Sequence, residues 1–122
     1  MARILVIEDE KMARYTVHQI LDRAGHEIEE AENGAIGLDR LEAAAFDLVI
    51  TDIFMPVMEG IETIQEIKRR HPDQKILAMS GGGRTQEIGV LRAAQAFGAV
   101  QHIAKPFSED QLLVMVEASL AG

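Results

Sequence analysis

The chain contains no cysteine, and this absence excludes disulfide bonds and thiolate metal sites. It also lacks an apolar run approaching the roughly 20 residues that a membrane-spanning helix needs. The apolar run at residues 4–7 is too short for a signal peptide, and acids follow it at once. We therefore expect a soluble, cytoplasmic protein without a membrane association.

Basic residues are the minority of the charges. Lys and Arg together number 12 against 20 for Asp and Glu, so the formal net charge is −8 at pH 7. Such a surface repels a phosphate backbone, and we expect no direct binding of nucleic acid by this chain. A tethered partner that binds DNA is compatible with this charge. The length of 122 residues, without an internal linker or a low-complexity segment, predicts a single domain with a sizeable core.

Short apolar runs alternate with segments of helical periodicity along the whole chain. We expect strands at residues 3–7, 26–31, 47–51, 76–79 and 99–103. We expect helices at residues 11–24, 33–44, 59–70 and 85–97, and a last helix from residue 108. This alternation predicts an α/β fold, a doubly wound parallel sheet with helices on both faces. The second strand carries Glu27, Glu29 and Glu30 and suits an edge, which favours the strand order 2-1-3-4-5.

Signals for the ends of helices are local. Gly25 is expected to stop the first helix, and Glu8 or Asp9 to cap its start. Ser108 and Gln111 fit a capping box at the start of the last helix.

Polar groups follow several of the expected strands. Glu8 and Asp9 follow the first strand, Asp52 the third, Ser80 the fourth and Lys105 the fifth. Ligands of doubly wound sheets bind at the carboxyl ends of the strands, where strands 1 and 3 diverge. Three carboxylates there repel one another, so either at least one takes up a proton or a cation neutralises them, and an all-oxygen site suits Mg²⁺. With a lysine to hold an anion, this set suits phosphoryl transfer to an aspartate, which would form an aspartyl phosphate.

Three tracts together resemble the receiver domain of two-component response regulators, the CheY-like fold: ILVIEDE at 4–10, DIFMPVMEG at 52–60 and KPF at 105–107. The resemblance covers essentially the whole chain. It implies a single receiver domain over residues 1–122, with no output domain in this chain, and a flavodoxin-like (βα)5 sheet. The order 2-1-3-4-5 is the known order of that fold, so the two expectations are not independent.

The resemblance also implies roles at the phosphorylation site. Asp52 would accept a phosphoryl group from a phosphohistidine on a histidine kinase or a histidine phosphotransfer protein. Asp9 and Asp52 would bind Mg²⁺ directly, together with the backbone carbonyl of Phe54, and Glu8 would act through a water molecule. Lys105 would pair with the phosphoryl oxygens.

Further roles concern the response to phosphorylation. Ser80 would turn inward to the phosphoryl group, and the bond before Pro106 would be cis. His102 matches the family's switch position, which usually holds Tyr or Phe. As a switch residue it would make the response sensitive to pH, and the alternative is an ordinary, partly exposed strand residue. Phe54, two residues after Asp52, is bulky and apolar, and we expect it to slow the loss of phosphate. The run Gly81–Gly83 is expected to form a loop that moves freely.

The output surface is expected on the fourth helix, fifth strand and fifth helix. Residues 112–116 are five consecutive apolar residues, more than one helix face can bury, so some should be exposed. The fifth helix contains no Lys or Arg, which disfavours the salt-bridged dimer common among DNA-binding relatives. A downstream target protein, a tethered output domain or a second copy of the chain is the expected partner.

Other functions fit less well. Within the same family, the chain is alternatively a phosphate relay or sink without its own output. A phosphohydrolase with an Asp nucleophile needs a second acid where Phe54 stands. A flavodoxin-like nucleotide binder needs a phosphate-cradling loop where residues 8–10 are acidic. We expect His18, His26 and His71, and the acidic residues 27–32, to be ordinary solvated surface.

Overall fold

The computed structural model describes residues 1–53, 60–80 and 101–121. The elements are β1 (Arg3–Ile7), α1 (Lys11–Arg23), β2 (Glu27–Ala31), α2 (Gly34–Ala43), β3 (Leu48–Asp52), α3 (Gly60–Arg70), β4 (Ile76–Ser80), β5 (Gln101–Ala104) and α5 (Glu109–Ala121). The expected helix at 85–97 and the loop at Gly81–Gly83 lie outside the described residues. None of the helices in the described ranges combines the length and hydropathy that crossing a bilayer requires.

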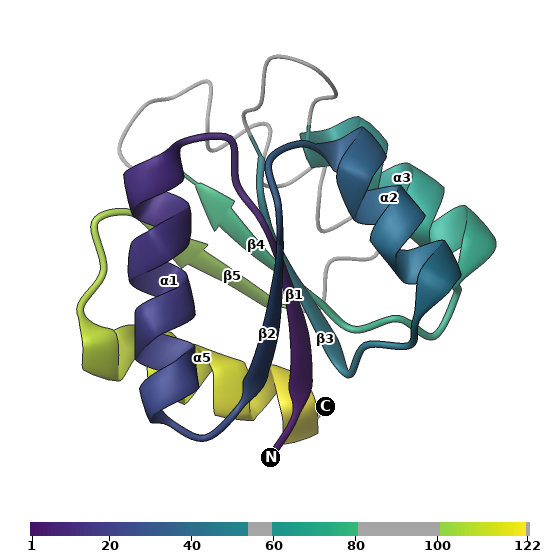
Figure 1. The fold of residues 1–122 in the computed structure, drawn as a ribbon. Coiled ribbons are helices and arrows are strands. Elements are labelled where there is room, and N and C mark those ends of the chain that lie inside the picture. The colour runs from purple at the N-terminus through teal and green to yellow at the C-terminus, as the bar shows by residue number, and fades with distance from the viewer. Residues whose placement is uncertain (54–59, 81–100, 122) are drawn as a thin grey trace.

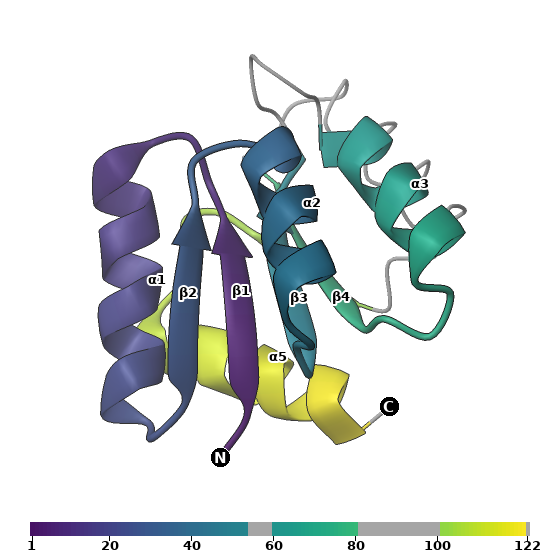
Figure 2. The same ribbon diagram turned by 45° about the vertical axis from the view of Figure 1, so that its right-hand side comes forward.

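The five strands form one sheet in the order β2-β1-β3-β4-β5, and every neighbouring pair is parallel. The predicted fold class and strand order are therefore confirmed, and the acidic second strand is at the edge. In Figures 1 and 2, α2 and α3 cover one face of the sheet, and α1 and α5 cover the other.

Each face of the sheet has its own apolar core. Leu38 of α2 and Ile64 of α3 pack with β-strand residues on one face, and Leu21 of α1 and Leu112 of α5 do so on the other. All five residues of β3 and all five of β4 are buried. Strands that are buried on both faces must be apolar along their length, as these are except where they approach the carboxyl edge.

The register of the strands brings their carboxyl ends together. Ile7 is opposite Thr51, so the residues that follow β1 emerge beside Asp52. Asp52 is opposite Met79, and Ser80 is opposite Ala104. The third strand extends one residue beyond its predicted end and includes Asp52, and the fourth includes Ser80.

The cap of α1 differs from the prediction. Glu10, rather than Glu8 or Asp9, is the N-cap, and its carboxylate accepts hydrogen bonds from the backbone N–H groups of Met12 and Ala13. Glu8 does not serve as the cap because its side chain is buried toward Lys105. The two other end signals are confirmed: Gly25 has a φ of 93°, and Ser108 and Gln111 exchange the hydrogen bonds of a capping box.

Two expectations about the surface were wrong. His26 is buried, because the chain turns at Gly25 and places the imidazole against Ala2, whose N–H donates to Nδ1 at 3.0 Å. The acidic strand β2 is also not simply solvated. Its Glu29 pairs with Arg3 at 2.8 Å, and Glu30 pairs with α1.

The apolar run in α5 follows the prediction, because Leu112 and Val116 are buried while Val114 is exposed.

Gly60 is required by close packing at the start of α3. A Cβ atom there would lie 2.2 Å from the carbonyl oxygen of Asp52 and 2.4 Å from the Cα of Ile53. Both contacts are with backbone, which cannot rotate away. We predict that Gly60→Ala lowers the free energy of unfolding by about 2–3 kcal/mol, measured by urea denaturation.

Gly25→Ala is the matched control, because its added Cβ meets nothing within 4 Å and its cost comes only from the positive φ. We expect that variant to lose about 1 kcal/mol. Equal losses at the two positions would contradict the steric explanation for Gly60.

Candidate functional site

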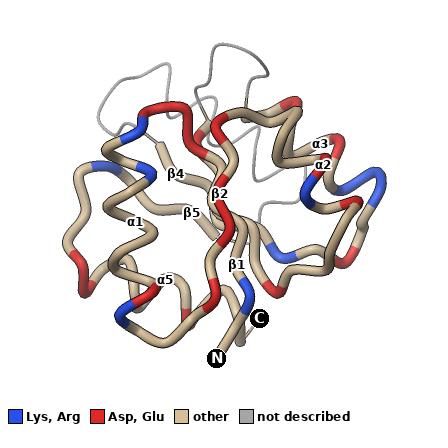
Figure 3. Tube along the Cα trace, viewed as in Figure 1, with Lys and Arg blue, Asp and Glu red and all other residues tan. Residues whose placement is uncertain are grey.

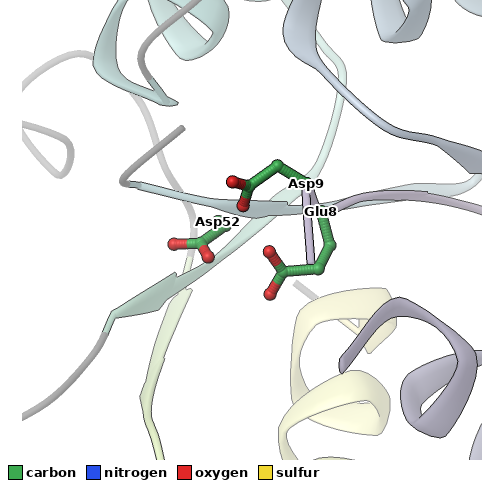
Figure 4. A group of neighbouring side chains, drawn as sticks. All are labelled: Glu8, Asp9 and Asp52. Carbon is green, nitrogen blue, oxygen red and sulfur yellow. The ribbon is translucent and has the colours of Figure 1, made fainter. Parts of the chain in front are cut away.

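Three carboxylates meet at the carboxyl edge of the sheet. Glu8 and Asp9 directly follow β1, and Asp52 ends β3. One oxygen from each lies within 4.8 Å of the others, and Figure 4 shows the three side chains gathered from the two strand ends. Glu8 and Asp52 are buried, whereas Asp9 is exposed. Such an all-oxygen set with one open side fits a hard divalent cation such as Mg²⁺, which retains several waters.

Lys105, which directly follows the edge strand β5, completes the group. Its Nζ donates to Oε1 of Glu8 at 2.5 Å and to Oδ2 of Asp52 at 2.9 Å. The lysine is placed by its own backbone N–H, which donates to the carbonyl oxygen of Ser80 at 2.6 Å. The peptide bond between Lys105 and Pro106 is cis, as the resemblance implied. The structure thus brings Glu8, Asp9, Asp52 and Lys105 together, with buried Ser80 ending the adjacent strand.

Burial and charge compete at this site. Burial raises the pKa of Glu8 from 4.5 to about 7, although the hydrogen bond from Lys105 opposes the shift, and the charge of Asp52 adds to it. Burial alone would lower the pKa of Lys105, but its hydrogen bonds with Glu8 and Asp52 outweigh burial and raise it. The Lys105 ammonium therefore keeps its proton, whereas the Glu8 carboxyl loses its proton less readily than a solvated glutamate does. A bound divalent cation would offset the electrostatic cost of this buried negative charge.

The residues predicted for the site also include Phe54 and His102. Phe54 lies outside the described residues, so its carbonyl and its ring are not placed here. His102 is exposed on β5, opposite Ala78 of β4. It lines a groove of about 580 Å³ between β5 and α5, together with Pro106, Val114 and other residues.

Sequence reasoning missed Arg14 and Glu30. Arg14 Nη1 donates to the carbonyl oxygen of Glu8 at 2.8 Å, and its Nε donates to Oε1 of Glu30 at 2.8 Å. Figure 3 shows acidic positions along β2 and in the turn after β1, with basic positions on α1 nearby. The available signal was a basic residue one turn into the first helix, beside an edge strand rich in acids.

Comparison with known proteins agrees with this geometry. The family model for the response regulator receiver domain matches residues 4–117. The chain belongs to this family. The receiver domain is 38% identical to the chemotaxis protein CheY of Bacillus subtilis over 119 residues, 97% of each chain.

Relatives of this chain include both longer proteins and receiver domains of similar length. The receiver domain is 32% identical to the transcriptional regulatory protein FixJ of Bradyrhizobium diazoefficiens, with 96% of this chain matched to 56% of that one. Among solved structures, the receiver domain of NtrX from Brucella abortus superposes with a TM-score of 0.91 at 33% identity and covers 97% of this chain and 98% of its own. The match thus spans nearly all of some relatives and about half of FixJ.

Membership settles the broad class. Receiver domains are phosphoacceptor domains of two-component signalling rather than enzymes in the usual sense, and they act with histidine kinases and output domains. Receiver domains bind Mg²⁺ in an acidic pocket, and the carboxylate group formed by Glu8, Asp9 and Asp52 is of that kind.

The raised pKa of Glu8 predicts a pH dependence of stability in metal-free buffer. A carboxyl group whose pKa is higher in the folded state stabilises the fold below pH 4.5 and loses that contribution as the pH rises through about 7. Glu8→Gln removes the titration. We expect it to raise the free energy of unfolding by about 1–3 kcal/mol at pH 8 relative to its effect at pH 4.5, measured by urea denaturation.

The control is Glu62→Gln, at an exposed position of α3. It should leave the dependence on pH unchanged. If Glu8→Gln retains the wild-type slope between pH 4.5 and pH 8, burial does not raise the pKa of Glu8 as described.

Proposed function

We propose that the protein is a phosphorylation-dependent switch in which Asp52 accepts a phosphoryl group from a phosphohistidine of a histidine kinase or histidine phosphotransfer protein. The observation that supports this most directly is the placement of the Lys105 ammonium 2.9 Å from Oδ2 of Asp52, at the edge where Glu8 and Asp9 also converge. An aspartate beside both a cation and a carboxylate pair is suited to nucleophilic attack on phosphorus.

The phosphoryl group passes from a ring nitrogen of the phosphohistidine to a carboxylate oxygen of Asp52. A carboxylate oxygen of Asp52 forms a bond to phosphorus, the bond between phosphorus and the imidazole nitrogen breaks, and the electron pair leaves with the imidazole. The product is an acyl phosphate on Asp52. Lys105 exchanges its contact with the carboxylates for the phosphoryl oxygens. The Ser80 hydroxyl donates to a phosphoryl oxygen in the product.

Asp9, Asp52 and the backbone carbonyl of Phe54 would hold Mg²⁺, and Glu8 would act through a water molecule. When bound, the ion supplies positive charge that offsets the charge of the phosphoryl oxygens. The protein's own contribution is to hold the carboxylates in place and to keep Lys105 charged.

The output step is proposed at the surface formed by the fourth helix, β5 and α5. Its described part has the groove between β5 and α5, in which His102 and the exposed Val114 lie. Movement of His102 with Ser80 would alter this groove and its fit to a downstream target or to a second copy of the chain.

Asp52→Asn tests the phosphoacceptor. We expect the wild-type protein to gain one phosphoryl group from acetyl phosphate and Mg²⁺ by intact mass, and Asp52→Asn to gain none. The control is Asp47→Asn, at the opposite end of β3, where the carboxylate accepts the N–H of Arg3. Labelling of Asp52→Asn at the wild-type level, or no labelling of the wild type by any phosphodonor or kinase, would contradict the proposal.

The role of His102 is tested by NMR of the imidazole ring. Beryllofluoride with Mg²⁺ is a phosphoryl analogue, and we expect it to shift the His102 ring signals in the wild type but not in Asp52→Asn. The rings of His18 and His71 serve as internal references because they lie on other elements or loops. Unchanged His102 signals in a protein that binds beryllofluoride would remove His102 from the switch.

A further inference from the structure

Arg14 contacts the backbone of the site rather than its carboxylates. Its side chain is only 14% exposed and runs from α1 to the end of β1, where Nη1 donates to the carbonyl oxygen of Glu8. That carbonyl belongs to the peptide that joins Glu8 to Asp9, the two acids that β1 contributes to the site.

This peptide joins the Cα atoms that carry the two acidic side chains. A peptide group is planar, so fixing the Glu8 carbonyl also fixes the direction of the Asp9 N–H, and with it the ψ angle of Glu8 and the φ angle of Asp9 that set the course of the chain between the two acids. The preceding peptide is already fixed, because the N–H of Glu8 donates to the carbonyl oxygen of Ala31 at 3.0 Å. The bond from Arg14 fixes the next one. Together they hold the chain at the point where the regular ladder of β1 ends.

Arg14 is itself held by β2. Its Nε donates to Oε1 of Glu30, and the other oxygen of that carboxylate lies 2.6 Å from Nδ1 of His18. Arg14 and His18 are one turn apart on α1, so both face the same strand residue. A planar guanidinium can donate in two fixed directions at once, which an ammonium does less well.

We propose that Arg14 is a positioning residue for metal binding: oriented by Glu30, it fixes the Glu8–Asp9 peptide so that both carboxylates converge on Asp52 before a cation arrives. This inference rests on the proposed function, because it assumes that the carboxylate group binds Mg²⁺. It assigns a role to the ion pair between Arg14 of α1 and Glu30 of β2, neither of which belongs to the group of three carboxylates.

The sign of the effect separates positioning from simple electrostatics. Removal of a positive charge near a cation site strengthens cation binding by Coulomb's law. Removal of a positioning contact weakens it, and loss of groups that orient metal ligands typically costs 10- to 100-fold in affinity. The two explanations therefore predict opposite changes for Arg14→Ala.

The experiment measures the dissociation constant for Mg²⁺ alone by calorimetric titration. We expect Arg14→Ala to bind about tenfold more weakly than the wild type. Arg14→Lys keeps the charge but loses the planar guanidinium that donates in two fixed directions. It should therefore bind Mg²⁺ more tightly than Arg14→Ala but more weakly than the wild type. Glu30→Gln keeps the side-chain volume but removes a negative charge as well as the ionic partner of Arg14, so both explanations predict weaker binding by this variant alone. The positioning role predicts that Glu30→Gln weakens binding less in the Arg14→Ala background than in the wild type.

Arg23→Ala is the matched control, since Arg23 lies on the same helix but pairs with Glu109 of α5. It should bind Mg²⁺ like the wild type or slightly more tightly. Unchanged or tighter binding by folded Arg14→Ala overturns the inference. If that variant does not fold, Arg14→Gln, which also removes the charge but keeps more of the side-chain volume, decides in its place, and unchanged or tighter binding there overturns it equally.

A second readout separates this inference from the proposed function. In metal-free protein, the Asp9 amide signal in NMR should shift in Arg14→Ala and Glu30→Gln and remain in place in Arg23→Ala. A wild type that neither binds Mg²⁺ nor accepts a phosphoryl group would overturn the proposed function and, with it, a role in metal binding. A wild type that does both, with an unmoved Asp9 amide in Arg14→Ala, would overturn the inference alone.

Discussion

The contact of one ammonium with two carboxylates, Lys105 with Glu8 and Asp52, is the constraint around which the carboxyl edge is organised. Two buried acids so close to each other repel, and burial adds to the cost. The lysine offsets much of that cost, yet the pKa of Glu8 is still raised to about 7. The site therefore has more negative charge than its own residues can neutralise. A pocket of this kind favours any cation that offers more charge than a lysine.

The fold supports this arrangement because the central strands of the sheet are buried and apolar away from their ends. Both faces of β3 and β4 are buried, and separate cores under α2 and α3 and under α1 and α5 stabilise the strands from the two sides. The parallel register then leaves no choice about where the strands end: Ile7 is paired with Thr51, so Glu8 must emerge beside Asp52. Gly60 allows α3 to begin directly against the same edge. The electrostatic repulsion among the acids is thus confined to the carboxyl edge of a well-packed sheet.

Patterns that depend on neighbouring residues in the chain could be predicted, and contacts across the fold could not. The acids of β2 correctly indicated an edge strand, and Ser108 with Gln111 correctly indicated a capping box. The polar residues at the strand ends indicated the site because parallel strands share one carboxyl edge. The cap of α1 was misassigned to Glu8 or Asp9 because Glu8 is withdrawn by Lys105, 97 residues away. The local sequence predicts solvated positions for His26 and Glu30, and the structure differs because their partners, Ala2 and Arg14, come from distant parts of the chain.

The two basic residues near the acids have different roles: one neutralises charge, and the other orients the backbone that carries the acids. Lys105 contacts the carboxylates themselves and supplies charge, and it is therefore the residue that an arriving phosphoryl group would recruit. Arg14 contacts only a carbonyl oxygen of the site and supplies direction, so its bonds need not break when Lys105 moves. Because Arg14 is tied to Glu30 on the edge strand, the orientation of the acids depends on the α1–β2 side of the sheet, while their neutralisation depends on β5 at the opposite side. On the proposed function, the frame that holds the acids can thus stay fixed while the β5 side responds to phosphorylation.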